Sequence, residues 1–275
     1  MQFKVMYYNI WHGFHSEWQK ENPTKPFIFY PERLEAAKQA VRDEKPDILV
    51  LGEACFSTPF IEISTGKTIH INYQKEFNFP NDEYIPREYE WGASILSRFK
   101  IKGVDNLTTE RRTFIRSEIL APHIFLDIVH PHPTLSEDEK TEFLKKVVSQ
   151  DRKNYLLVGD FNALSDEDIY DREQLSMAFA RIMGTAASQK ISDMLRCEAV
   201  RFVRSTGLID TFRANNSNFD YTIPTDILSP HKNSAIRIDY IFCSPDFKIK
   251  EAYILKNSAT ERASDHYPVV AVLEV

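Results

Sequence analysis

Short apolar runs that end at turn-forming residues recur along the chain and predict β-strands. The run 47–51 is continuously apolar after Asp47 rather than alternating, which is typical of a strand buried on both faces. The pattern predicts strands at 3–10, 47–51, 93–96, 113–120, 124–129, 155–158, 236–243, 252–256 and 269–274. The chain is therefore rich in strands, and helical segments lie between them.

Three regions carry helical signals. Pro31 stands at a first-turn position and opens a helix whose apolar residues follow at helical spacing. Ser136 and Glu139 form the capping-box pattern and begin a second helix, which we expect to reach about residue 150. The stretch 171–206 predicts two helices around a break at 184–187.

Length and composition indicate one globular domain. The chain has 275 residues, of which 43% are hydrophobic and 27% charged, and it contains no repeat or Gly/Ser-rich linker. We therefore expect a single domain over residues 1–275, with a helical insertion at about 164–206. No run approaches the ~18 apolar residues of a membrane span, and the first residues lack a signal-peptide pattern, so we expect a cytoplasmic protein. The odd number and wide spacing of the cysteines predict buried reduced thiols at Cys55, Cys197 and Cys243.

The acidic balance of the chain restricts its function. A formal net charge of -6 argues against a protein that coats DNA regardless of sequence, because such a protein carries a basic surface. The charge does not exclude a nuclease, since a bound metal ion neutralises phosphate locally. One basic segment stands out, and it is either a phosphate-binding surface or a solvated hairpin edge: Arg98, Lys100, Lys102, Arg111, Arg112 and Arg116.

Polar residues able to bind a metal ion or move a proton stand where apolar strands end. Ligands gather beyond the carboxyl ends of strands in α/β sheets, so these residues are candidates for one site. Each one alone is also compatible with an ordinary cap or turn. The residues are Asn9, Glu53, His130, Asp160, Asn162, Asp239, Asp265 and His266. Asp239 lies inside an apolar run, where a buried carboxylate needs a partner.

Seven motifs, in order along the chain, resemble those of the endonuclease/exonuclease/phosphatase superfamily, which has the deoxyribonuclease-I-like fold. They are YNIWHG, PDILVLGE, GASILSR, VHPH, VGDFNA, RIDYIF and SDHYPV. The resemblance implies an α/β (α+β) fold, a four-layer sandwich of two packed mixed β-sheets flanked by helices. It also implies metal-dependent hydrolysis of a phosphate ester. The chain departs from the family at Gly52, where glutamine is usual, and in the longer Ile-Trp-His-Gly turn after Asn9.

The chemistry of phosphate-ester hydrolysis assigns roles to these residues. Glu53 is the best Mg²⁺ ligand, with Asn9 and Asp265 as further ligands and Mn²⁺ as the alternative ion.

Asp160 would take a proton from the attacking water, and Asn162 would orient that water or the phosphate. His266 would contact phosphate oxygen, with its tautomer held by Asp239. The resemblance implies that His130 is a second active-site histidine, and His132 is the alternative for that role.

The substrate is predicted from charge and from the insertion. An acidic chain repels long polyanions, and helices at 164–206 are expected to wall one side of the pocket. We therefore expect a phosphodiesterase or phosphatase that prefers small or lipid-linked phosphate esters to nucleic acid. The alternative enzyme is a DNA endonuclease or exonuclease, including one that cleaves abasic sites. A binding module without catalysis is a third hypothesis, although every expected catalytic residue type is present.

Overall fold

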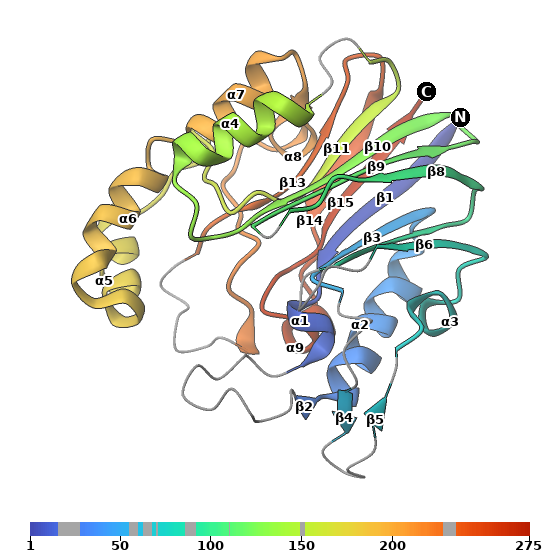
Figure 1. Cartoon of the computed structure of the whole chain (residues 1–275), viewed down its shortest axis with the longest axis horizontal. Coiled ribbons are helices and arrows are strands. Elements are labelled where there is room, and N and C mark those ends of the chain that lie inside the picture. The colour runs from blue at the N-terminus through green and yellow to red at the C-terminus, as the bar shows by residue number, and fades with distance from the viewer. Residues whose placement is uncertain are drawn as a thin grey trace.

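The computed structural model describes most of the chain: residues 1–15, 28–54, 60–62, 68–69, 71–85, 92–109, 111–148, 152–227 and 235–275. These residues form two six-stranded sheets and a small three-stranded sheet, with helices on the outside (Figure 1). The small sheet consists of β2 (Ile28–Phe29), β4 (Phe60–Glu62) and β5 (Thr68–Ile69).

The first large sheet is built around the N-terminal strand. Strand β1 (Gln2–Asn9) pairs in parallel with β3 (Ile48–Gly52) and antiparallel with β15 (Val269–Glu274). The sheet continues with β7 (Ala93–Ser97) and β6 (Asn81–Ile85) on one side and β14 (Lys248–Ile254) on the other. Both β1 and β3 are buried on both faces over most of their length, as their apolar runs predict.

The second large sheet has the order β12-β13-β11-β10-β9-β8. Its strands are β8 (Ile101–Asn106), β9 (Arg112–Ile119), β10 (Ile124–Pro131), β11 (Tyr155–Asp160), β12 (Ile209–Asp210) and β13 (Asp239–Cys243). Strands β10 and β11 are parallel, whereas β13 runs antiparallel to β11. The sheet is therefore mixed, like the first.

The two large sheets pack face to face over one apolar core. Val5 and Val50 from the first sheet and Leu126 and Val158 from the second belong to the same buried cluster. Helices cover the outer faces (Figure 1). They are α2 (Pro31–Glu44), α3 (Tyr73–Phe77) and α9 (Thr260–Ala263) on the first sheet, and α4 (Glu137–Val147) and α7 (Glu198–Ser205) on the second. The predicted four-layer sandwich is confirmed.

The region after β11 is helical, as its sequence predicts. Helices α5 (Arg172–Met183) and α6 (Ala187–Met194) lie on either side of a 3-10 turn at Gly184–Ala186 and pack against each other. Figure 1 shows this pair extending past the end of the second sheet, whereas α7 packs on α4. The side chain of Asp171 caps α5 by accepting from the backbone N–H groups of Glu173 and Gln174.

Several predicted boundaries differ from the structure. Strand β13 begins at Asp239 rather than at 236, so Asp239 stands at a strand end and not inside a strand. The strand predicted at 252–256 corresponds to β14, which spans Lys248–Ile254 and so begins and ends earlier than predicted. Strands β6 and β8 and the short helix α8 (Thr211–Asn215) were not predicted, because their sequences mix polar and charged residues without a clear period.

The expected capping box and two of the expected buried thiols are present in the described residues. The capping box of Ser136 and Glu139 is formed, and α4 ends at Val147. Cys197 and Cys243 are buried thiols, whereas Cys55 lies outside the described residues. No helix among the described residues is long and apolar enough to cross a membrane.

Candidate active site

Strand register brings the predicted site residues to one edge of the two sheets. Asn9 at the end of β1 is paired with Gly52 at the end of β3, which places Glu53 beside Asn9. In the second sheet, Asp160 at the end of β11 is directly opposite Asp239 at the start of β13. Because the two sheets pack face to face, these ends meet across the interface.

Glu53 and Asp160 are joined by Asn9. The side-chain nitrogen of Asn9 donates to Glu53 Oε1 (3.1 Å) and to Asp160 Oδ2 (3.3 Å). Its side-chain oxygen accepts from the backbone N–H of Trp11 (3.0 Å). All three residues are buried. The Asn9 amide therefore bridges, inside the protein, one carboxylate from each sheet. In this arrangement Asn9 presents its nitrogen to the carboxylates, and its role as an oxygen ligand of a metal ion stays a prediction.

His130, rather than His132, lies beside these carboxylates. Its Nε2 atom is 3.8 Å from Glu53 Oε1 and 3.7 Å from Asp160 Oδ2, and the residue is buried. The His132 ring bonds instead through Nδ1 to Thr134 Oγ1 (2.8 Å). The geometry therefore favours His130 over the alternative.

Asp239 and His266 form a buried pair. His266 Nδ1 lies 2.8 Å from Asp239 Oδ2, and His266 Nε2 lies 4.0 Å from Asp265 Oδ1. Burial disfavours a charged ring, but Asp239 and then Asp265 raise the pKa of His266 well above its ordinary value. Ser264 Oγ donates to Asn9 O (2.7 Å), which ties the loop before β15 to the end of β1.

Asn162 closes the turn after β11. Its backbone N–H donates to Asp160 Oδ1 (2.8 Å), and its side-chain nitrogen donates to Pro131 O (3.0 Å). The residue has a φ of 48°, a left-handed conformation that asparagine tolerates better than most residues. Lys140 Nζ donates to Asn162 O from α4. The turn is thus held by two elements of the second sheet and by a helix outside it.

Burial and mutual repulsion set the charges of the carboxylates. Burial first, and Asp239 second, raise the pKa of Asp160 well above its ordinary value. Burial also raises the pKa of Asp265. Burial alone would raise the pKa of Glu53 as well, but His12, His130 and His266 together lower it below the usual value. Of Glu53, Asp160 and Asp265, only Glu53 has a pKa below its ordinary value, so it stays ionised more readily than the other two.

The donor set fits a divalent metal ion. Ligand atoms of Glu53, His130 and Asp160 all lie within 4.8 Å of one another, and so do those of Asp160, Asp239 and His266. Buried carboxylates that repel one another are stabilised by a bound cation. Asp265 is outside both groups, but its charge raises the pKa of His266, and the charge of Glu53 raises the pKa of Asp265.

Two features of the site were missed by sequence reasoning. His12 follows β1 by three positions, and its backbone N–H donates to Glu53 Oε2 (3.1 Å). Tyr7 explains the unusual glycine before Glu53, because a Cβ atom on Gly52 would lie 2.2 Å from the Tyr7 hydroxyl oxygen. The sequence departs from the family pattern at both positions, in YNIWHG and at the glycine of LGE. These departures marked the two positions but indicated no role for either residue.

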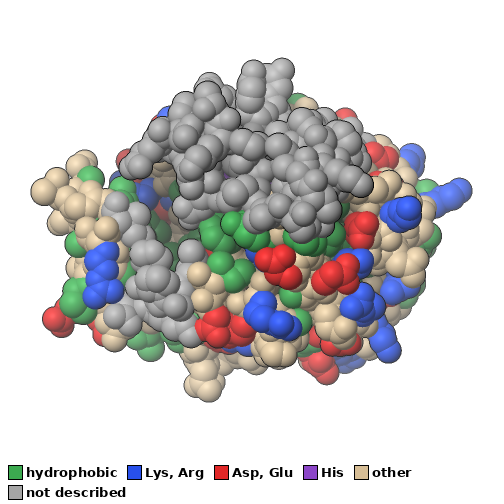
Figure 2. Space-filling model, turned by 90° about the horizontal axis from the view of Figure 1, so that it is seen from below, with side chains coloured by type: hydrophobic (Ala, Val, Ile, Leu, Met, Phe, Trp, Pro, Cys, Tyr) green, Lys and Arg blue, Asp and Glu red, His purple; other side chains and the backbone are tan. Residues whose placement is uncertain are grey.

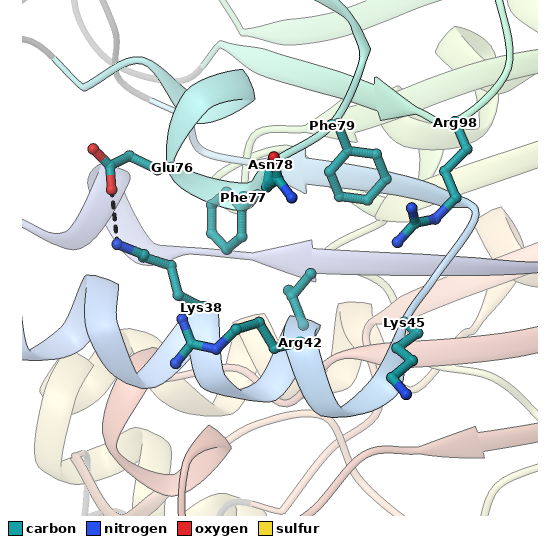
Figure 3. A pocket seen from close by; sticks show the side chains of 9 residues that line it. Lys38, Arg42, Lys45, Glu76, Phe77, Asn78, Phe79 and Arg98 are labelled. Carbon is teal, nitrogen blue, oxygen red and sulfur yellow. Dashed lines mark hydrogen bonds and ion pairs between the residues drawn. The ribbon is translucent and has the colours of Figure 1, made fainter.

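The basic segment 98–116 is largely engaged by the protein itself. Arg116 pairs with Asp127 (2.8 Å), and Arg111 donates to Thr134 Oγ1 (2.8 Å). Its first residue, Arg98, lines a surface groove of about 360 Å³ between α2 and α3 (Figure 3). The backbone N–H of Arg98 donates to Asp47 O, at the opposite end of β3 from Glu53, so this groove is separate from the site. These contacts favour the hairpin-edge interpretation of the segment.

Comparisons with known proteins agree with the fold and the motifs. Residues 6–266 match the model of the Endonuclease/Exonuclease/phosphatase family. Among solved structures, an AP endonuclease from Archaeoglobus fulgidus is 18% identical, with a TM-score of 0.66 over 99% of this chain and 100% of the other. The 3′ phosphatase NExo from Neisseria, bound to a product DNA hairpin, is 19% identical, with a TM-score of 0.62 over 99% and 100%. The D. rerio TDP2 complex with a single-strand DNA product is 13% identical, with a TM-score of 0.59 over 100% and 99%. No curated protein matches the sequence.

The predicted preference for small or lipid-linked esters over nucleic acid is wrong in the light of these comparisons. Two of these similar structures hold DNA products, and the third is an AP endonuclease. Net charge misled because it sums over the whole chain, whereas Glu53, Asp160, Asp239 and Asp265 are buried in the site itself. Figure 2 shows acidic and basic side chains interspersed on the visible part of one face, not a repulsive acidic surface.

Proposed function

Because the chain belongs to the Endonuclease/Exonuclease/phosphatase family, we propose that it hydrolyses phosphoesters of nucleic acid with the help of a divalent metal ion. Members of this family are phosphoester hydrolases. The observation that carries the proposal is the contact network from Asn9 to Glu53, His130 and Asp160, which brings residues of both sheets into one buried centre. The DNA-bound neighbours support nucleic acid as the substrate class.

We assign Glu53 as the principal metal ligand, and Asp265 and Asn9 as further ligands. The lowered pKa of Glu53 keeps its carboxylate charged, as a ligand of Mg²⁺ or Mn²⁺ must be. A divalent ion at such a site supplies neutralisation of phosphate oxygen and a more acidic bound water. Asn9 holds the Glu53 carboxylate in place through Oε1.

Asp160 is the residue we assign to accept the proton of the attacking water. A raised pKa suits a general base, because its basicity then approaches that needed near neutral pH. The backbone N–H of Asn162 fixes one carboxylate oxygen and Asn9 the other, so the side chain cannot rotate freely. Asn162 would also contact the phosphate or the water.

We assign to His266 and His130 the stabilisation of negative charge on the phosphate. Asp239 holds Nδ1 of His266, which leaves Nε2 for a phosphate oxygen, and the raised pKa favours a charged ring. His130 Nε2 lies between Glu53 and Asp160, where a ring N–H would meet the phosphate. Preorganised donors of this kind lower the barrier because charge develops beside them.

The proposal is tested with end-labelled DNA oligonucleotides: single strands, duplexes, duplexes with one abasic site, and strands with a 3′ phosphate. Each is incubated with Mg²⁺, Mn²⁺ or EDTA, alongside a small phosphodiester for comparison. We expect cleavage of at least one DNA substrate that EDTA abolishes, loss of it in Asp160→Asn, and retention in the matched variant His132→Asn.

Two results would contradict the proposal. Undiminished cleavage in EDTA would remove the metal requirement. Hydrolysis of the small ester with no activity on any DNA substrate would remove nucleic acid as the substrate class.

A further inference from the structure

The turn after β1 holds a histidine that the proposed mechanism does not use. His12 approaches Glu53 with two groups: its backbone N–H lies 3.1 Å from Oε2, and its ring Nδ1 lies 3.7 Å from the same oxygen. The His12 side chain is only 12% exposed. The ring therefore lies within the buried centre, on the Oε2 side of Glu53, whereas His130 approaches Oε1.

The conformation of this turn is costly. All residues of α1 (Trp11–Phe14) have positive φ: 43° at Trp11, 51° at His12, 61° at Gly13 and 68° at Phe14. A left-handed conformation costs about 1–2 kcal/mol for each residue other than glycine. Such strain persists only where the surrounding structure determines it, and it concentrates at functional sites.

Arg33 on α2 stabilises the turn through hydrogen bonds to its backbone. Its buried guanidinium donates to backbone oxygens on both sides of His12, namely those of Ile10, Trp11 and His15. It also donates to Ala263 O, next to the loop that carries Asp265 and His266. The guanidinium carbon lies 4.6 Å from the centroid of the Trp11 ring. These contacts of Arg33 therefore fix the backbone on both sides of His12.

We propose that Nδ1 of His12 is a nitrogen ligand of the divalent ion held by Glu53, and that it shifts the preference of the site from Mg²⁺ towards Mn²⁺. The inference rests on the proposed metal-dependent function. Two donors that are each about 2.1 Å from one ion lie roughly 3.0 Å apart when adjacent and roughly 4.2 Å apart when opposite. The observed 3.7 Å between His12 Nδ1 and Glu53 Oε2 falls within this interval.

The chemistry of the donors gives the direction of the effect. Mg²⁺ prefers oxygen ligands and keeps several waters, whereas divalent transition ions accept nitrogen ligands more readily, with Mn²⁺ binding them least strongly of that series. Glu53 and Asp265 alone form an oxygen site that suits Mg²⁺. With the His12 ring beside Glu53 Oε2, the site gains a nitrogen donor, and Mn²⁺ gains affinity over Mg²⁺.

The test measures metal binding directly, without turnover. Metal-free wild type is compared with His12→Asn by calorimetric titration with Mn²⁺ and with Mg²⁺, and ¹⁴N modulation is recorded in pulsed electron paramagnetic resonance of the Mn²⁺ complex. Asparagine tolerates the φ of 51°, so this variant keeps the turn while it replaces the imidazole by an amide. His132→Asn is the matched control.

We expect His12→Asn to lose about tenfold in Mn²⁺ affinity, a size typical of disturbed metal sites. Mg²⁺ affinity should change by less than about twofold, because Mg²⁺ accepts oxygen or water instead. The ¹⁴N modulation should fall in His12→Asn and stay unchanged in His132→Asn. If His12→Asn does not fold, His12→Gly serves instead, since glycine also adopts this φ.

The outcomes separate this inference from the function on which it rests. Equal losses of Mn²⁺ and Mg²⁺ affinity, or an unchanged ratio and unchanged modulation, would overturn the role of His12 and leave metal dependence standing. A wild type that binds neither ion at millimolar concentration would overturn both.

Discussion

Replacing Lys140 by methionine tests how strongly the buried ion pair behind the site supports the fold. Lys140 and Glu137 of α4 are both fully buried, with Nζ 3.2 Å from Glu137 Oε1. Glu137 Oε2 also accepts from the backbone N–H of Ala199 at the start of α7 (3.0 Å), and Lys140 Nζ donates to Asn162 O. The pair therefore joins two helices to the turn that follows β11.

The cost of Lys140→Met follows from the charge that it leaves behind. Removing one partner of a buried pair costs about 3–5 kcal/mol, because the other charge stays buried and unpaired. With about 2–4 °C of melting temperature for each kcal/mol, the melting temperature should fall by roughly 6–20 °C. The double variant Glu137→Gln/Lys140→Met removes both charges, so it should be more stable than Lys140→Met alone.

The loss of stability in Lys140→Met should also depend on pH. Burial already raises the pKa of Glu137, and removing Lys140 removes the interaction that opposes this rise. The native variant then binds more protons than the unfolded chain, so its stability decreases as pH rises above the ordinary pKa of glutamate. Urea unfolding should give a smaller destabilisation of Lys140→Met at about pH 5 than at about pH 8. A loss below about 1 kcal/mol that is equal at both pH values would refute the reasoning.

Three further predictions test the site itself. Glu53→Gln should weaken Mg²⁺ and Mn²⁺ binding and lower turnover by several orders of magnitude without unfolding the chain, and an unchanged metal titration curve would contradict its role. Asp239→Asn and His266→Asn should each cost about as much in kcat/KM as the double variant, whereas additive losses would argue against a couple. Gly52→Ala should destabilise by about 1–3 kcal/mol, because its Cβ would meet the Tyr7 hydroxyl. Adding Tyr7→Phe should recover part of that loss in thermal unfolding, and no recovery would show that another contact is responsible.

The sequence predicts where the candidate site residues lie when it predicts the preceding strands correctly. Glu53 and Asp160 each stand at the carboxyl end of a continuous apolar run. Because such a run forms a buried strand that ends at one edge of the sheet, the position of the polar residue at that end is fixed by the sheet. The need of Asp239 for a partner is equally visible in the sequence, because a carboxylate beside an apolar run is costly to bury alone. The structure brings it to 2.8 Å from His266.

Residues whose role depends on tertiary context are not visible in the same way. His12 lies in a turn whose left-handed backbone has no signature in Trp-His-Gly-Phe beyond its single glycine. Lys140 and Glu137 have the three-residue spacing of an ordinary surface pair on a helix, and tertiary contacts with α7 and with the turn after β11 bury them. Charge summed over the chain likewise says nothing of where the acidic groups lie.

Two of the buried cations, Arg33 and Lys140, share a role that follows from the backbone oxygens to which they donate. Arg33 donates to backbone oxygens around the His12 turn and beside the Asp265 loop, and Lys140 donates to the backbone oxygen of Asn162. A carbonyl group is neutral, so it orients Arg33 without cancelling its charge, whereas Lys140 is also paired with the Glu137 carboxylate. Arg33 accordingly opposes the rise that burial causes in the pKa of Asp265, after the larger effect of His266. Both cations thus fix loops of the site through backbone oxygens, and Arg33 also supplies positive potential beside Asp265.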